Sequence, residues 1–240
     1  MDVPARTSVS PTSAATPTSA ASLKGEITIE EPTRAERAIA RRSAETRATV
    51  PDLELSVDVD AGPLLGWARD QSCSTTAVLI GACAGALRQF PRVNAAYRDG
   101  RYELYSRVNV SVTMHVRDAP QTATLLDADT KSTAELDQEL DRLIQRARAG
   151  HLTPPEQAGA TFTLSDLGPF GVHRVGALIT PPQAGALTAG AIHAVARVHD
   201  GIVAPGYELA LTLACDHRIV FPAQGAAFLA RIAEELQTLG

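Results

Sequence analysis

The segment Ala214-Cys-Asp-His-Arg-Ile-Val220 carries the most distinctive chemistry of the chain. It follows an apolar run and precedes the last amphipathic stretch, so Asp216, His217 and Arg218 are expected where a strand ends and a loop begins. Catalytic side chains commonly occupy such positions, because a rigid scaffold holds the loop. A histidine there can take up a proton near neutral pH, and the segment predicts a general base at His217.

Cys215 offers a second chemistry in the same segment. It lies two residues before His217, so the two side chains would share one face of a strand. A cysteine–histidine nucleophilic pair is therefore one hypothesis. The favoured interpretation is a buried structural thiol.

The elements that must position this loop are read from the periodicity of apolar residues. Residues 207–214 form a long apolar strand, and residues 224–239 have the spacing of an amphipathic helix. Strict alternation predicts a half-buried strand over residues 53–60, and Asp99-Gly100 predicts a hairpin turn.

Capping signals mark two further helices. Thr33 and Glu36 form a capping box for a helix over 34–46, and Gly150 ends a helix over 132–149. Further helices are predicted at 61–71 and 75–90, and further strands at 26–29, 102–105, 108–116, 161–164, 177–180 and 185–196. Because strands and helices mix without regular βαβ repetition, the fold class is predicted to be α+β with a mixed sheet.

Composition narrows the class of protein. The 240 residues include 22 basic and 27 acidic side chains, a net charge of −5, which is the wrong sign for binding a phosphate backbone. Three cysteines form neither a disulfide framework nor a zinc pattern, and the histidines lack metal-ligand spacing. We therefore expect no nucleic acid and no metal.

The first residues differ from the rest. Residues 1–25 are nearly all Ser, Thr, Ala and Pro, which predicts a disordered arm before one domain over 26–240. No apolar run approaches the roughly 18 residues of a membrane helix, and the N-terminus has no signal-peptide pattern. The expected location is cytoplasmic, with no membrane contact.

The Asp-His-Arg sequence at the end of the last strand resembles the signature of the acyltransferase (E2) catalytic domains of 2-oxoacid dehydrogenase complexes. Other segments resemble that family in the same order, at residues 34–42, 49–60, 148–154, 161–171 and 179–183. The resemblance covers residues 26–240. It implies the fold of the related chloramphenicol acetyltransferases, with a mixed sheet flanked by helices, and a homotrimer or a higher assembly of trimers.

The resemblance also implies roles for single residues. His217 matches the catalytic histidine, which removes a proton from an acceptor thiol or hydroxyl so that it attacks a thioester. Ser165 matches the residue whose hydroxyl stabilises the oxyanion. Asp216, Arg218 and Arg42 are expected to support the catalytic loop. In the family, the histidine and the serine of one site come from neighbouring subunits.

One departure from the family concerns Phe221. The family motif continues Asp-His-Arg-x-x-Asp-Gly, whereas this chain has Phe221-Pro222. The missing aspartate pairs, in the family, with an arginine of the first helix that Arg42 matches here. Arg42 is therefore expected to find another carboxylate, to face solvent or to help bind a substrate.

The acceptor is inferred from what precedes residue 26. No lipoyl domain is recognisable there, which favours a diffusible thioester. We expect CoA or acetyl-CoA as co-substrate, no covalently attached lipoyl group, and a small-molecule acceptor with a hydroxyl group. A tetronate intermediate of natural-product (antibiotic) biosynthesis is one hypothesis. The alternatives are a dihydrolipoamide acyltransferase core and a catalytically inactive trimeric scaffold.

Overall fold

The computed structural model describes residues 25–116, 119–199 and 201–239, so the predicted arm of residues 1–25 lies outside them except for Gly25. The chain divides into two units, residues 1–41 and 42–240. The sheet and the helices that pack on it belong to the second unit. No helix of the described ranges is long and apolar enough to cross a membrane.

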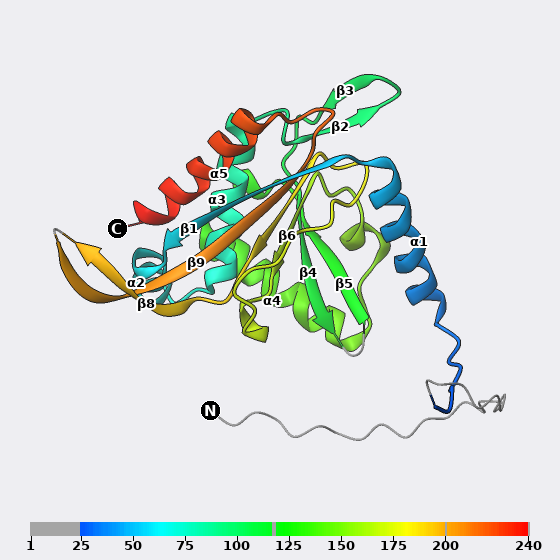
Figure 1. The fold of residues 1–240 in the computed structure, drawn as a ribbon, viewed down its shortest axis with the longest axis horizontal. Coiled ribbons are helices and arrows are strands. Elements are labelled where there is room, and N and C mark those ends of the chain that lie inside the picture. The colour runs from blue at the N-terminus through cyan, green and yellow to red at the C-terminus, as the bar shows by residue number, and fades with distance from the viewer. Residues whose placement is uncertain (1–24, 117–118, 200, 240) are drawn as a thin grey trace. The chain divides into compact units, whose positions relative to one another are not determined.

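The described ranges contain helices and strands without regular alternation (Figure 1). The α-helices are α1 (Arg34–Thr49), α2 (Gly62–Asp70), α3 (Thr75–Gln89), α4 (Thr133–Ala149) and α5 (Pro222–Gln237). The strands are β1 (Asp52–Asp60), β2 (Ala95–Arg98), β3 (Arg101–Leu104), β4 (Val110–Val116), β5 (Ala119–Leu125), β6 (Phe162–Asp166), β7 (Gly185–Ala189), β8 (His193–His199) and β9 (Ile202–Asp216). Short 3₁₀ turns are η1 (Ala128–Thr130), η2 (Pro154–Gln157) and η3 (Gly168–Phe170).

Seven of these strands form one mixed sheet in the order β1-β9-β7-β6-β4-β5, with β8 also paired to β9. The neighbours β4/β6 and β6/β7 are parallel, and the other pairs are antiparallel. The strands β2 and β3 form a separate hairpin. The predicted α+β fold with a mixed sheet is confirmed.

Helices α2, α3, α4 and α5 pack on one face of the sheet. Phe162 of β6 and Phe228 of α5 are fully buried there, with ring centroids 5.8 Å apart, and Phe90 lies 5.8 Å from Phe228 on the other side. Helix α3 is rich in small residues, so its backbone can approach the sheet and α5 closely. Three of the five phenylalanines thus pack together where the layers meet.

The side chains of successive β9 residues point to opposite faces of the sheet. Leu209, Leu211 and Leu213 belong to the core beneath the helices, whereas Thr212 and Ala214 are buried on the opposite face. Part of that opposite face is covered by residues 172–183, because Ala177 and Ile179 of this segment pack with Ala186 and Ala214.

Local signals in the sequence are reproduced at four places. Thr33 and Glu36 exchange backbone-to-side-chain hydrogen bonds at the start of α1, and Ser132 and Glu135 do so at the start of α4. Gly150 ends α4 with φ of 74°. The turn Asp99-Gly100 has positive φ at both residues, 50° and 75°, as a two-residue hairpin requires.

Three predicted strands are wrong. Residues 26–29 and 177–180 adopt no strand pairing. The strand predicted over 185–196 is two strands, interrupted at residues 190–192. The backbone of His173 crosses at this interruption, so closely that a Cβ on Gly190 would lie 1.9 Å from the His173 carbonyl oxygen. Apolar periodicity does not report such a crossing of two distant segments.

Candidate active site

The turn after β9 is the place where the sequence predicts chemistry. Asp216 is the last residue of β9, and its carbonyl accepts hydrogen bonds from the N–H groups of Ile219 and Val220. The N–H of His217 donates to the carbonyl of Pro51 at 2.9 Å, just before β1. Helix α5 begins at Pro222. The turn is therefore held by backbone bonds within it and by one to the residue before β1.

Asp216 and Arg218 fix the same turn through their side chains. Arg218 donates to the Asp216 carboxylate from Nε at 2.9 Å and from Nη2 at 2.6 Å, and its backbone N–H adds a third bond at 3.0 Å. Asp216 is buried, at 3% exposure. The hydrogen bond from Arg218 to Asp216 is the main cause that raises the pKa of Arg218 above its usual value.

Arg218 also reaches residues that the sequence did not suggest. Its Nη1 donates to the Thr49 carbonyl at 3.1 Å, and its guanidinium lies 4.7 Å from the ring centroid of Tyr97. The Tyr102 hydroxyl donates to the Arg218 carbonyl at 3.2 Å. The β2–β3 hairpin and the end of α1 thus hold the turn. These partners are remote in sequence, and no local pattern marks them.

His217 itself is exposed at the start of this turn. Its Nδ1 lies 3.2 Å from the carbonyl oxygen of Val220. Because a carbonyl can only accept, this contact assigns the proton of the neutral ring to Nδ1 and leaves a lone pair on Nε2. The geometry presents an imidazole that is oriented by the backbone and can accept a proton from an approaching group.

Phe221 and Arg42 occupy the two positions for which the family resemblance implies an aspartate–arginine ion pair. The ring of Phe221 lies edge-to-face with that of His217, with centroids 6.0 Å apart and planes at 72°. Arg42 is exposed and forms no ion pair within the described part of the chain. Within one chain, Arg42 therefore has no carboxylate partner among the described residues and is exposed.

Ser165 lies on β6, far from His217 of the same chain. Sheet register places Ser165 level with Thr188 and Thr212, and His217 follows Thr212 by five residues on a strand two positions away. With about 3.3 Å per residue and about 4.8 Å between strands, their Cα atoms are roughly 20 Å apart. One chain therefore does not bring the predicted base and the predicted oxyanion donor together.

The side chain of Ser165 points to the sheet face opposite the helices, since Phe162 and Leu164 point into the helical core. It is half-buried, and its Oγ donates to Thr113 Oγ1 at 3.0 Å. The hydroxyl is thus held at an accessible position on the open face of the sheet.

Cys215 is a structural thiol, as the favoured interpretation has it. Its side chain is fully buried among core residues. Burial, reinforced by the charge of Asp216, raises the pKa of Cys215 to about 12. Such a thiol is not ionised near neutral pH, which argues against a cysteine nucleophile.

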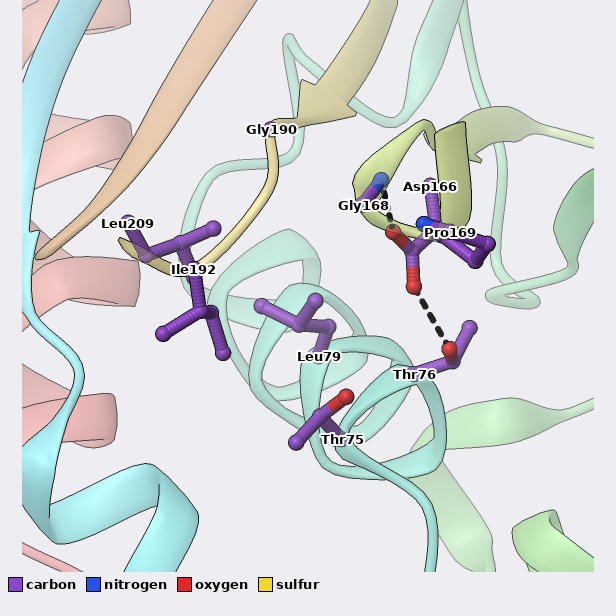
Figure 2. Close-up of a pocket in the computed structure, with 9 residues that line it drawn as sticks. All are labelled: Thr75, Thr76, Leu79, Asp166, Gly168, Pro169, Gly190, Ile192 and Leu209. Carbon is purple, nitrogen blue, oxygen red and sulfur yellow. Dashed lines mark hydrogen bonds between the residues drawn. The ribbon is translucent and has the colours of Figure 1, made fainter. Parts of the chain in front are cut away.

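A separate pocket of about 260 Å³ lies near the start of α3 (Figure 2). Asp166 at its wall accepts hydrogen bonds from Thr76 Oγ1 at 2.7 Å and from the Gly168 N–H at 2.9 Å. None of the predicted site residues lines this pocket. Within the described residues, no group of three or more His, Cys, Asp and Glu side chains could hold a metal ion.

Comparison with known proteins identifies the relatives of the chain. Residues 24–239 match the family of 2-oxoacid dehydrogenases acyltransferases (catalytic domain). The dihydrolipoyllysine-residue acetyltransferase component of the pyruvate dehydrogenase complex of Rickettsia bellii is 33% identical over 202 residues, which are 80% of this chain and 48% of the relative. The corresponding component of Zymomonas mobilis is 35% identical over 202 residues, 80% and 46% of the two chains.

Solved structures agree on the fold. A probable dihydrolipoamide acetyltransferase from Listeria monocytogenes has a TM-score of 0.83 at 26% identity, covering 88% of this chain and 95% of that one. Azotobacter vinelandii dihydrolipoamide acetyltransferase has a TM-score of 0.87 at 23% identity, with coverage of 93% and 96%. A chloramphenicol acetyltransferase is more distant, with a TM-score of 0.53 at 14% identity, covering 82% of this chain and 94% of that one.

These relatives correct the expected cofactor. The expectation that no covalently attached lipoyl group is involved is wrong, because the curated relatives are named for acetyl transfer involving a dihydrolipoyllysine residue. The chain spans about half the length of those relatives. That no lipoyl domain is recognisable before residue 26 therefore does not support the hypothesis of a free-standing enzyme.

The same relatives change the order of the functional hypotheses. They support the alternative, a dihydrolipoamide acyltransferase, over a hydroxyl acceptor such as a tetronate. The family that matches residues 24–239 is the same acyltransferase family that the sequence motifs resemble. The chain belongs to the 2-oxoacid dehydrogenase acyltransferases and comprises their catalytic domain.

Proposed function

We propose that the domain transfers an acyl group between the thiol of a dihydrolipoyl group and the thiol of CoA. Nε2 of His217 takes the proton of the attacking thiol, and the sulfur adds to the thioester carbonyl. The Ser165 hydroxyl donates a hydrogen bond to the tetrahedral oxyanion. When the intermediate collapses, the carbon–sulfur bond to the donor breaks, and the departing thiolate takes the proton from His217.

The proposal depends above all on the state of His217. Its Nδ1–H is engaged by the Val220 carbonyl, so Nε2 keeps a free lone pair on an exposed residue at the start of a rigid turn. A base needs this combination of fixed orientation and access to an incoming proton. The buried Asp216 and the bidentate Arg218 supply the rigidity.

The distance between His217 and Ser165 within one chain leads to the second part of the proposal. Because His217 and Ser165 of one chain are roughly 20 Å apart, a working site requires His217 of one copy and Ser165 of another. A homotrimer provides three equivalent sites of this kind. A solved relative is the cubic core of a pyruvate dehydrogenase complex, and further assembly of trimers is part of the proposal.

The first test measures acyl transfer from acetyl-CoA to dihydrolipoamide, with both products separated by chromatography. We expect His217→Ala to lower kcat by about 10²–10⁴-fold, the usual contribution of a general base. His151→Ala is the matched control, because His151 is also exposed but lies after α4. Turnover by His217→Ala at the wild-type rate would refute the proposed base.

The acceptor is tested with the same variants. Wild-type turnover with small alcohols but not with dihydrolipoamide would replace the thiol acceptor with the hydroxyl acceptor. If a folded wild-type protein transfers acetyl groups to neither, the scaffold hypothesis is supported and the proposed function is wrong.

Mixed assemblies test the shared site. We expect His217→Ala and Ser165→Ala to be inactive alone, but to regain activity when they are co-expressed with different tags and purified through both. In such an assembly some sites combine an intact histidine from one copy with an intact serine from the other. Mixed assemblies without activity would refute the shared site.

A further inference from the structure

Hydroxyl side chains form a continuous row across the open face of the sheet. Pairing register places one Ser or Thr of each of six strands at the same level, in the order Ser56, Thr212, Thr188, Ser165, Thr113 and Thr122. Ser165, the proposed oxyanion donor, lies inside this row. Its neighbours are therefore the groups that can influence its proton.

The three hydroxyls on the β1 side of the row are hydrogen-bonded to partners other than Ser165. Ser56 and Thr212 share a hydrogen bond of 3.0 Å. The hydroxyl of Thr188 donates to the Val175 carbonyl at 2.5 Å, beneath the segment that covers this part of the face. None of these three hydroxyls contacts Ser165 within the described residues.

The Thr113 hydroxyl, unlike these three, is hydrogen-bonded to Ser165. Ser165 is its one hydrogen-bonding partner among the described residues, at 3.0 Å. Both residues are half-buried and lie side by side on the parallel strands β4 and β6. Val112 and Met114 anchor the neighbouring positions of β4 in the core on the opposite face, and a β-branched side chain has few rotamers. Thr113 is thus a rigid neighbour.

A count of protons shows what this contact can do. The Ser165 hydroxyl has one proton, which it gives to Thr113 Oγ1 in the resting structure. To stabilise an oxyanion, Ser165 must turn that proton toward the substrate. Thr113 then has its own proton to donate to Ser165 Oγ, since no other acceptor among the described residues holds it.

We propose that Thr113 is a positioning residue for Ser165, which orients the serine hydroxyl at rest and donates to its oxygen when the oxyanion forms. This inference rests on the proposed function. A donor that is itself hydrogen-bonded becomes a better donor, because polar bonds in a chain polarise one another. No covalent bond changes, and both protons return when the intermediate collapses.

The test compares Thr113→Val, which removes the hydroxyl at nearly constant shape, with Thr113→Ser, which keeps it. We expect Thr113→Val to lower kcat roughly three- to tenfold, the range of a net hydrogen bond, with KM changed less than twofold. Thr113→Ser should restore most of the rate. Thermal unfolding of each variant establishes that the fold is intact.

A double-mutant cycle with Ser165→Ala separates positioning from a merely structural effect. If Thr113 acts through Ser165, Thr113→Val should change kcat less than about 1.5-fold when the serine hydroxyl is absent. An equal loss in both backgrounds, or a loss in Thr113→Ser as large as in Thr113→Val, would overturn the inference.

The cycle also distinguishes this inference from the function on which it rests. An inactive wild type, or a Ser165→Ala variant with normal kcat, refutes the proposed function or its oxyanion donor, and the role of Thr113 with it. An active wild type, a slow Ser165→Ala and a normal Thr113→Val refute the role of Thr113 alone.

Discussion

At the scale of single residues, Phe221 is the side chain that packs against the proposed base, His217. It presents an aromatic edge or face to His217 where the family has a carboxylate, so no negative charge lies at that position. A carboxylate at about 6 Å would favour the protonated imidazole.

We predict that Phe221→Asp moves the acid limb of the kcat/KM profile to higher pH by about half a unit, from Coulomb attraction at about 6 Å in water. The sign follows because a base that holds its proton more tightly is neutral only at higher pH. The pH–rate profile measures the shift. Phe221→Asn is the matched control, with the size of Asp but no charge, and an identical profile for both variants would contradict the charge argument.

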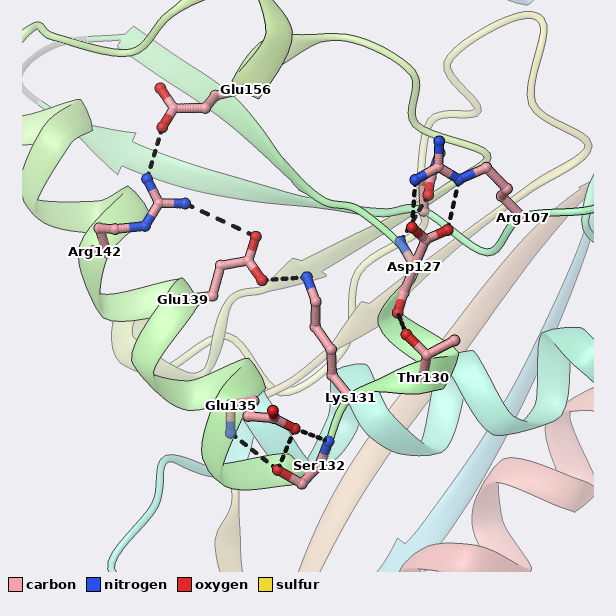
Figure 3. A network of polar contacts seen from close by, with 10 residues as sticks. Arg107, Asp127, Thr130, Lys131, Ser132, Glu135, Glu139, Arg142 and Glu156 are labelled. Atoms are coloured by element: carbon pink, nitrogen blue, oxygen red, sulfur yellow. Dashed lines mark hydrogen bonds and ion pairs between the residues drawn. The ribbon is translucent and has the colours of Figure 1, made fainter.

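At the scale of elements, Glu156 ties the end of α4 to η2 (Figure 3). The N–H of Thr153 donates to Glu156 at 2.8 Å, and Arg142 donates at 2.9 Å. The Thr153 N–H, with help from the Thr153 hydroxyl, Arg142 and Arg146, lowers the pKa of Glu156 to about 2 from 4.5. A carboxylate with a lowered pKa stabilises the fold above its unfolded pKa.

We therefore expect Glu156→Gln to lower the free energy of unfolding at pH 7 by about 1.5–2 kcal/mol, the lower part of the range for hydrogen bonds to charged groups. The difference from wild type should shrink as pH falls from about 4.5 toward 2, where Glu156 gains its proton. Urea unfolding at several pH values measures it. Asp141→Asn on the exposed side of α4 is the control, and a difference that persists at low pH would argue against Glu156 ionisation.

The break between β7 and β8 leads to a second prediction for elements. Gly190→Ala would place a methyl group 1.9 Å from the His173 carbonyl oxygen, so the segment that crosses there must move. We expect a loss of roughly 2–4 kcal/mol in urea unfolding, typical of overpacking at a rigid contact. Gly66→Ala in α2 meets open space and should instead gain about 0.5–1 kcal/mol. Equal stability of the two variants would contradict the steric argument.

Comparison of sequence and structure shows which features are encoded locally. The alternation of β1, the Asp99-Gly100 turn and the Gly150 cap that ends α4 depend on residues a few positions apart, and each is predicted correctly. The contacts of Arg218 with Thr49 and Tyr97, and the distance between Ser165 and His217, depend on the order of strands in the sheet. Periodicity carries no information on that order, so these parts of the site required the fold.

At the scale of the whole molecule, Phe228 joins the helical layer to the sheet. Its ring meets Phe162 of β6 at 66° and Phe90 at the end of α3 at 78°, both edge-on at 5.8 Å, and it is fully buried. Most of the core is built from Ala, Val, Leu and Ile, so one large ring contributes a large share of the contact between layers. Its removal should affect every element that packs on it.

We predict that Phe228→Ala lowers the free energy of unfolding by about 3–5 kcal/mol and Tm by roughly 10 °C. Phe228→Leu should lose only about 1–1.5 kcal/mol, because it leaves a smaller cavity. Leu104→Ala on the exposed hairpin is the control and should change stability by less than about 0.5 kcal/mol. Because α3, α5 and β6 share this contact, circular dichroism and tryptophan fluorescence should report one coincident transition in each variant. Separate transitions would show that the helical layer unfolds independently of the sheet.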